Sequence, residues 1–197
     1  KDKYSEKSGV QITSDKLTDS DKEVFESYIH GLYDADVALG ELIEYFSKVE
    51  KPVVIVFWGD HLPNLNLEDG DSVYSKLEYS PKGESYEWEG EDLKKMLSTD
   101  YVIWNNFGMK KEDKTIGSAM FGVEVVEMLG FEMTDYFKWI RGYVMDDFVM
   151  YRSRIFASAS KTYSDVPKEY ESMINDYSSV VRDIIYGENK FFPLPER

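Results

Sequence analysis

Apolar residues recur at spacings of three and four over the first quarter of the chain, which predicts an amphipathic helix over about residues 21–48. Ser20 is placed to cap the start of this helix, and Glu23 is its expected partner in a capping box. Lys51-Pro52 ends the helix, because the residue before a proline is driven out of the helical conformation. The apolar stripe consists of Val24, Tyr28, Leu32, Ala35, Leu39, Ile43 and Phe46.

An uninterrupted apolar run then follows at residues 53–58, Val-Val-Ile-Val-Phe-Trp. Such a run, rich in β-branched and aromatic residues, is typical of a strand buried on both faces, as in a parallel sheet covered by helices. A second strand is predicted at residues 101–104. Helix, proline break and buried strand together predict the α/β class.

The rest of the chain contains four weaker helix signals. Short helices are expected at about residues 91–97 and from Thr134 to about Ile140, and a longer one over residues 118–129 closed by Gly130. The last helix has Pro167 in its first turn and ends at Gly187. Residues 142–164 have no clear period and receive no assignment.

The amino-acid composition argues against several classes of function. Lys and Arg number 23 against 38 Asp and Glu, for a formal charge of −15. A chain this acidic does not suit nucleic acid or an anionic membrane surface as a partner. The absence of cysteine excludes thiol catalysis and thiolate metal sites. With no run of 18 apolar residues, a membrane anchor is expected only upstream of Lys1.

The residues with the clearest chemical potential follow the first strand, in Trp58-Gly59-Asp60-His61-Leu62-Pro63. Ligands of open α/β sheets bind beyond the carboxyl ends of strands. A carboxylate oxygen and an imidazole nitrogen there suit Zn²⁺ or Mn²⁺ better than Ca²⁺. Gly59 is expected to let the backbone turn sharply, and Pro63 to stiffen the exit. The alternative is a plain loop cap, because two ligands do not fill a coordination sphere.

Other polar residues have weaker cases. Asn105 and Asn106 follow the second strand and are weak candidates for lining a substrate site. His30 is expected to pack on the long helix, away from chemistry, and Arg141 to act as a cation at a helix C-terminus. No nucleophile is assigned, since the threonines of the polar loops lack a surrounding motif; these are Thr13, Thr18, Thr99 and Thr115.

Residues 53–63, V-V-I-V-F-W-G-D-H-L-P, resemble the strand and metal-binding turn of the sulfatase family of the alkaline phosphatase superfamily. The resemblance is to the branch that contains lipoteichoic acid synthases and phosphoglycerol transferases, which carries Gly-Asp-His-Leu-Pro at this point. It extends over most of the chain, to residues 33–43, 100–107, 120–130 and 176–187.

The resemblance implies that residues 1–197 are the C-terminal part of a catalytic domain, with part of an alkaline-phosphatase-like sheet and flanking helices. Asp60 and His61 would be half of a site for a divalent ion, Mn²⁺ or Zn²⁺. The family's nucleophile and its other ligands precede this region. The expected partner is therefore the N-terminal part of the same domain, and the chain alone is expected to be inactive.

Three functions follow as expectations. The first is phosphoglycerol transfer from a phospholipid head group or to a cell-surface polymer, at the extracellular face of the membrane. The second is hydrolysis of sulfate esters; a threonine nucleophile would indicate the first reaction, and a formylglycine motif the second. The third is a non-catalytic module that binds a partner or glycan through the aromatic residues 74–88. Exposed sheet edges are expected to cause some self-association.

Overall fold

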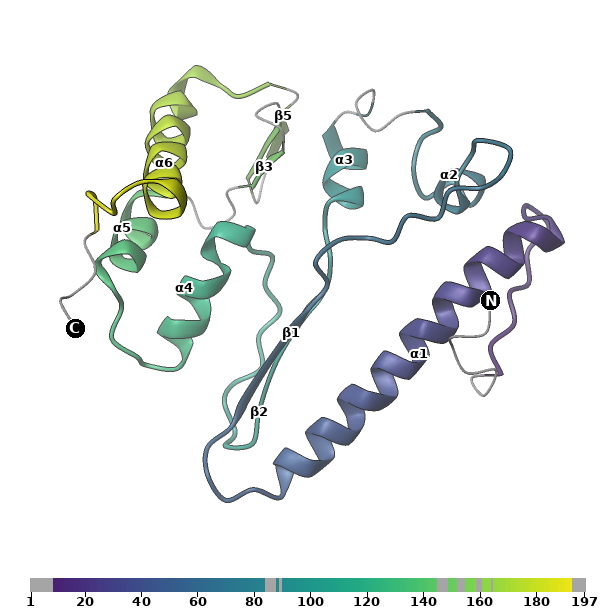
Figure 1. The fold of residues 1–197 in the computed structure, drawn as a ribbon, viewed down its shortest axis with the longest axis horizontal. Helices are drawn as coiled ribbons and strands as arrows, with labels where there is room; N and C mark the ends of the chain where they lie inside the picture. Colours follow the sequence, from purple (N-terminus) through teal and green to yellow (C-terminus); the bar gives the residue numbers. More distant parts are fainter. Residues whose placement is uncertain are drawn as a thin grey trace. The chain divides into compact units, whose positions relative to one another are not determined.

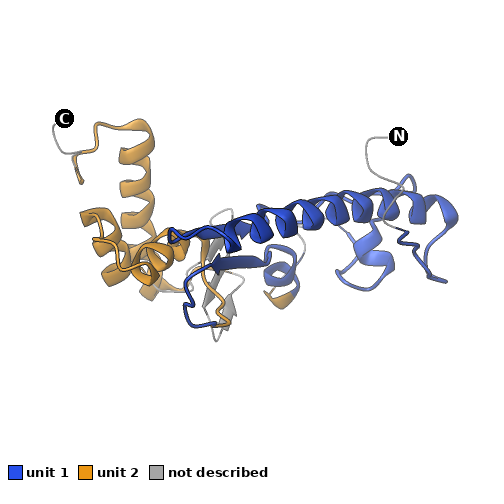
Figure 2. Cartoon of the chain, turned by 90° about the horizontal axis from the view of Figure 1, so that it is seen from below, with its two compact units in different colours: residues 1–88, 92–111 blue, residues 89–91, 112–197 orange. Residues whose placement is uncertain are grey.

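The computed structural model describes residues 9–83, 88, 90–144, 149–151, 155–158, 161–163 and 165–192. The chain divides into two compact units, coloured separately in Figure 2. Unit 1 consists of residues 1–88 and 92–111, and unit 2 of residues 89–91 and 112–197. Each unit is described by itself.

Unit 1 begins with the long helix α1 (Asp19–Ser47), which confirms the predicted helix (Figure 1). The expected burial of its apolar stripe was wrong, since Val24 and Leu32 are 38% and 51% exposed. The predicted cap was wrong by two residues. Thr18, in an extended conformation, accepts a hydrogen bond from the Asp21 backbone N–H, and the Asp21 carboxylate accepts one from the Thr18 N–H. Because this reciprocal pair satisfies two backbone donors, the helix starts before Ser20.

Two strands follow, β1 (Val54–Trp58) and β2 (Tyr101–Asn105), separated by the short helices α2 (Val73–Lys76) and α3 (Gly90–Met96). The strands pair antiparallel, with Val54 opposite Asn105 and Trp58 opposite Tyr101 (Figure 1). The α/β composition and both strand positions agree with the prediction, but among the described residues this sheet has only two strands.

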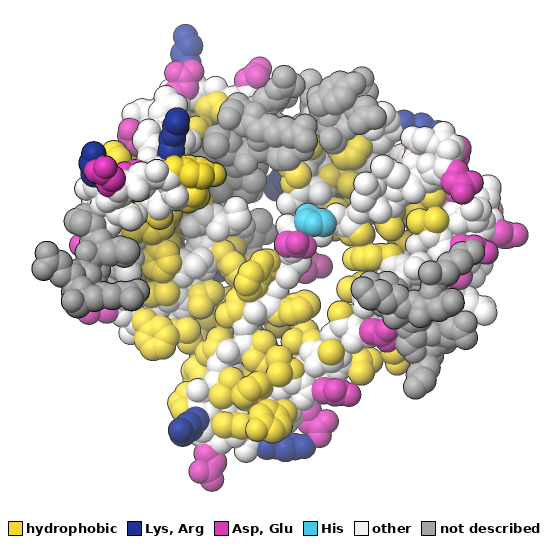
Figure 3. Space-filling model, in the orientation of Figure 1, with side chains coloured by type: hydrophobic (Ala, Val, Ile, Leu, Met, Phe, Trp, Pro, Cys, Tyr) yellow, Lys and Arg dark blue, Asp and Glu magenta, His cyan; other side chains and the backbone are white. Residues whose placement is uncertain are grey.

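The predicted burial of the first strand on both faces, as in a parallel sheet, was wrong. No residue of β1 or β2 is buried, and Phe57 and Trp58 are 46% and 56% exposed. Among the described residues this sheet has only two strands, and a two-stranded ribbon buries less of its surface than the wide, helix-covered sheet that was expected. Hydrophobic side chains gather over this part of unit 1 in Figure 3.

The loop after β1 is anchored on a small core. Leu65 and Leu67 are 5% and 8% exposed and pack with Leu17 and Val73. Lys76 of α2 forms ion pairs at 2.8 Å with Asp21 and 2.7 Å with Asp69, which joins the start of α1 to this loop. The hydrogen bond from Lys76 lowers the pKa of the Asp21 carboxyl below its ordinary value. The structure therefore fixes the segment that leaves the first strand.

Unit 2 contains the helices α4 (Ser118–Met128), α5 (Asp135–Tyr143) and α6 (Lys168–Tyr186). All three were predicted, and so was the Thr134 cap of α5. Gly130, at φ +67°, ends α4 in a Schellman motif, because its N–H donates to Glu127 and the next N–H to Val126. A three-stranded antiparallel sheet lies in the region without assignment: β3 (Val149–Tyr151), β4 (Ile155–Ser158) and β5 (Lys161–Tyr163).

A shared core holds α4, α5 and α6 together. Its members come from all three helices and from the residue that follows α5, and two of them, Met120 and Val123, are 0% exposed. The buried residues are Met120, Val123, Ile140, Val144, Met173 and Ile174. In the described residues, no helix of either unit is long and apolar enough to cross a membrane.

Asn106 connects the end of α1 to the start of β1. Its Oδ1 accepts a hydrogen bond from the Val53 N–H at 2.9 Å. Its Nδ2 donates to the backbone carbonyl oxygens of Phe46, Val49 and Lys51 at 3.1, 2.8 and 3.0 Å. The side chain therefore links three backbone carbonyls at the helix end and in the turn to the residue that precedes β1; of these, the Phe46 carbonyl also accepts from the Val49 N–H.

We expect Asn106→Asp to lower the free energy of unfolding by about 1–3 kcal/mol, because the carboxylate keeps the acceptor but leaves the three carbonyl groups without their donor. The measurement is urea unfolding at pH 7. The matched control is Asn105→Asp: Asn105 Oδ1 accepts from the Phe107 and Met109 N–H groups, a role that a carboxylate can keep. Equal losses in the two variants would contradict the assignment.

Candidate metal centre

Asp60 and His61 lie just beyond the end of β1, which ends at Trp58. The ladder continues through Gly59, whose N–H donates to the Asp100 carbonyl at 3.2 Å, and Thr99 Oγ1 donates to the Gly59 carbonyl at 2.6 Å. A Cβ at Gly59 would lie 3.2 Å from Thr99 Cβ. Gly59 does not have a positive φ, so the advantage of glycine there is the close approach of the Thr99 side chain.

The exit of the segment is held from the other side. The Tyr74 hydroxyl, on α2, donates to the Pro63 carbonyl at 3.0 Å. Between these two anchors, the side chains of Asp60 and His61 are 82% and 76% exposed. The segment is therefore held at both ends, and the side chains of Asp60 and His61 are exposed to solvent between them.

The two side chains are arranged by local hydrogen bonds. The His61 N–H donates to Asp60 Oδ1 at 2.9 Å. His61 Nδ1 lies 2.9 Å from the Leu62 carbonyl oxygen. Since a carbonyl only accepts, Nδ1 carries the proton, and in the neutral form of the ring the lone pair is then on Nε2. A backbone carbonyl that fixes the tautomer in this way is the usual partner of a metal-binding histidine.

The free acceptor atoms of the pair lie close together. His61 Nε2 is 3.5 Å from Asp60 Oδ2. Two ligand atoms about 2.1 Å from one ion, at a tetrahedral angle, would be roughly 3.4 Å apart. A protonated ring at the same distance would instead form an ion pair with the carboxylate. With an unprotonated Nε2, the imidazole and the carboxylate would therefore fit two adjacent positions around a divalent ion.

The described residues supply no third ligand. Among them, no group of three His, Asp or Glu side chains is arranged to hold a metal ion. A divalent ion needs four or more ligands, so Asp60 and His61 fit half of a site. Their role as metal ligands stays a prediction.

The structure does not bring the two asparagine candidates to this pair. Asn105 lies opposite Val54, at the other end of the ribbon from Asp60, about 13 Å along the strand from Trp58. The side-chain oxygens of Asn105 and Asn106 both accept backbone N–H groups. The prediction that they line a substrate site stays open.

The other polar residues named from the sequence have structural contacts. His30 Nε2 lies 3.4 Å from the Val10 carbonyl oxygen. Arg141 forms ion pairs with Glu124, at 2.9 Å, and with Glu127. Lys114 and Arg141 keep the pKa of the Glu124 carboxyl below its ordinary value, although burial acts in the opposite direction. The Arg141 guanidinium therefore forms its ion pairs with carboxylates of unit 2.

Thr99 and Tyr74 are the contributors to the site that sequence reasoning missed. Thr99 was considered only as a nucleophile, and Tyr74 only as part of an aromatic segment. The available signal was the position of Thr99 just before the second strand, where an antiparallel partner meets the end of the first strand. To predict the contact between Thr99 and Gly59, one would need to know that the two strands pair antiparallel, which the sequence did not show.

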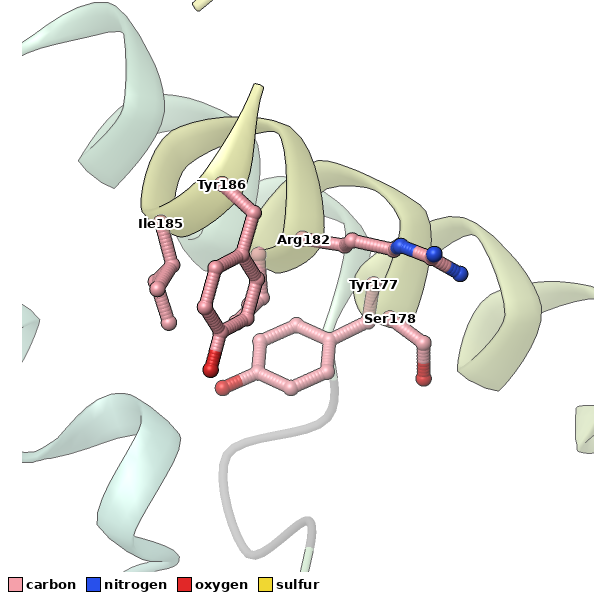
Figure 4. Close-up of a pocket in the computed structure, with 6 residues that line it drawn as sticks. Tyr177, Ser178, Arg182, Ile185 and Tyr186 are labelled. Carbon is pink, nitrogen blue, oxygen red and sulfur yellow. The ribbon is translucent and has the colours of Figure 1, made fainter.

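A separate hollow of about 490 Å³ lies along α6 in unit 2. Figure 4 shows the rings of Tyr177 and Tyr186 next to one another, with Arg182 on the same helix. Neither Asp60 nor His61 lines it. The lining residues are Tyr177, Ser178, Val181, Arg182, Ile185 and Tyr186.

Comparison with known proteins gives three findings. The model of the Sulfatase family matches residues 1–127. A curated protein of Rhizobium meliloti (strain 1021), described as a putative cyclic beta-1,2-glucan modification protein, is 31% identical over 145 residues. That alignment covers 72% of this chain and 21% of the relative.

The third finding is a solved structure, the Streptococcus pyogenes phosphoglycerol transferase GacH in complex with sn-glycerol-1-phosphate. It matches 98% of this chain and 45% of its own, with a TM-score of 0.63 and 20% identity. This likeness concerns the fold. The chain therefore spans less than half the length of the two proteins that it matches.

Proposed function

The chain belongs to the sulfatase family, and from this premise we propose that it forms part of a divalent-metal-dependent phosphoglycerol transferase. The observation that supports the metal role is the 3.5 Å approach of His61 Nε2 to Asp60 Oδ2, with Nδ1 engaged by the Leu62 carbonyl. The choice of phosphoglycerol is supported by the Gly-Asp-His-Leu-Pro turn and by the fold shared with a phosphoglycerol transferase.

In this proposal Asp60 supplies a carboxylate oxygen and His61 supplies Nε2 to one ion, Mn²⁺ or Zn²⁺. The bound ion would lower the pKa of the attacking hydroxyl and stabilise negative charge on the transferred group. The Leu62 carbonyl would keep the imidazole in the tautomer that leaves Nε2 available to an ion. The bond from the His61 N–H to Asp60 Oδ1 limits rotation of the carboxylate and leaves Oδ2 for the metal.

The remaining ligands and the nucleophile would come from the N-terminal part of the same domain. We therefore expect residues 1–197 alone to be inactive, and the complete enzyme to act at the extracellular face of the membrane. Its substrate would be an anionic phosphoglycerol group of a lipid head group or a cell-surface polymer.

Hydrolysis of sulfate esters is the second candidate, because the matching family model is described as Sulfatase. Both reactions transfer a tetrahedral anionic group, and the same pair of ligands serves either. The nucleophile would distinguish them: a threonine for phosphoglycerol transfer, and a formylglycine for sulfate-ester hydrolysis.

The test measures the activity of the complete catalytic domain, that is, residues 1–197 together with the N-terminal part. The assay contains Mn²⁺ and either phosphatidylglycerol vesicles or an aryl sulfate as substrate. We expect release of diacylglycerol from the vesicles, a loss of at least about 100-fold in Asp60→Ala, and no loss in Asp36→Ala, which changes an exposed carboxylate on α1. Turnover of the aryl sulfate alone would favour the second candidate. Activity that survives in Asp60→Ala would contradict the metal role.

A further inference from the structure

We propose that Thr99 and Tyr74 are positioning residues of the Asp60–His61 site, whose hydroxyl groups hold the backbone on each side of the pair. This inference rests on the proposed metal function. In this proposal the two residues act on the backbone and are not themselves ligands of the ion. The two hydroxyls hold the carbonyls of Gly59 and Pro63.

Thr99 controls the entry to the pair. The Gly59 carbonyl belongs to the peptide plane that leads directly into Asp60, so its direction sets the conformation from which the carboxylate projects. Thr99 Oγ1 donates to that carbonyl oxygen at 2.6 Å. The Gly59 N–H, in the preceding peptide plane, is held by the Asp100 carbonyl. The two neighbouring planes are therefore both tied to the residues that lead into β2.

Tyr74 controls the exit. Its hydroxyl donates to the Pro63 carbonyl, and its ring packs against the core cluster of Leu65 and Val73. The ring also lies 5.8 Å, between centroids, from the ring of Tyr79. Burial raises the pKa of the Tyr74 phenol to about 12, so the group remains a hydrogen-bond donor at neutral pH. The donor is thus carried on a side chain that the core holds in place.

These bonds should matter more for the position of the ligands than for stability. A carbonyl near the surface that loses a side-chain donor can bond to water, so the loss of each hydroxyl should shift the urea midpoint only slightly. Groups that orient metal ligands from outside the coordination sphere typically change metal affinity by about 10–100-fold. The two effects can therefore be separated by experiment.

The test compares Thr99→Ala with Thr99→Ser, which differ by one hydroxyl, and Tyr74→Phe with the unchanged protein. Affinity for Mn²⁺ is measured by titration, and the tautomer of His61 without metal by the nitrogen resonances of its ring. We expect Thr99→Ala and Tyr74→Phe to bind Mn²⁺ about 10-fold more weakly and to mix the His61 tautomers. Thr99→Ser should behave as the unchanged protein, and the urea midpoints of the metal-free variants should change little.

Unchanged His61 resonances in Thr99→Ala and Tyr74→Phe would overturn the proposal, and so would equal losses in Thr99→Ala and Thr99→Ser. If the unchanged protein bound no Mn²⁺ while the resonances shifted as expected, the positioning role would stand and the metal function would fail. If it bound Mn²⁺ and all variants bound it equally, the metal function would stand and the positioning role would fail.

Discussion

Replacing His61 with alanine is expected to abolish the binding of Mn²⁺ and Zn²⁺ by residues 1–197. With two ligands on an exposed turn, the unchanged chain should bind weakly, with a Kd of about 1 mM, or roughly 4 kcal/mol of binding free energy. His61 Nε2 is one of only two ligand atoms that the described site offers. Without it a lone exposed carboxylate remains, and we expect the affinity to fall by more than about 100-fold, below what the titration detects.

The measurement is a calorimetric titration of the metal-free protein with Mn²⁺ and then with Zn²⁺. The matched control is His30→Ala, because His30 is the other of the two histidines of the chain and lies on α1. Loss of binding in His61→Ala but not in His30→Ala would support the half-site. Stoichiometric binding at micromolar Kd would show that the chain holds a full ligand set. Equal metal affinity in His61→Ala and the unchanged chain would favour the non-catalytic module.

The second large effect is on stability, in the core of unit 2. Met120 of α4 is 0% exposed and packs with Val123 and Ile140. We expect Met120→Ala to lower the free energy of unfolding by about 2–5 kcal/mol, because the cavity removes apolar contacts that the neighbouring helices only partly restore. Helix propensity changes little, since Met and Ala are both good helix formers. The Tm should fall by roughly 5–15 °C.

Met128→Ala is the matched control, because Met128 is on the same helix and 41% exposed. Calorimetric unfolding of the two variants separates the effect of burial from that of the substitution itself. A change below about 1 kcal/mol in Met128→Ala is expected. A similarly small change in Met120→Ala would show that α4 does not pack on α5 and α6 as described.

The positions of most helices could be predicted because the signals are local, but the short helix α2 was not predicted. The spacing from Val24 to Phe46 specifies one face of α1, and Gly130 marks the end of α4 through its own backbone conformation. Cap residues were harder to predict. Thr18 and Ser20 are both suitable caps, and the choice depended on the bond that Asp21 returns to the Thr18 N–H.

The pairing of the strands could not be predicted in the same way. An apolar run such as residues 53–58 looks the same whether its neighbour is parallel or antiparallel, and whether its faces are covered. The structure pairs Val54–Trp58 antiparallel with Tyr101–Asn105 and leaves Phe57 and Trp58 exposed. Pairing joins segments far apart in the chain, so it depends on contacts that no local window contains.

The sequence by itself determined the α/β elements and the adjacent Asp60 and His61, because neighbours in the chain stay neighbours in space. Only the tertiary structure decided what holds that pair. Thr99 is 40 residues from Gly59, and Tyr74 is 11 residues from Pro63. The antiparallel register brings the first of these hydroxyls to its carbonyl, and the packing of α2 on Leu65 and Val73 brings the second. A hydrogen bond between distant residues forms only where the fold places donor and acceptor within about 3 Å.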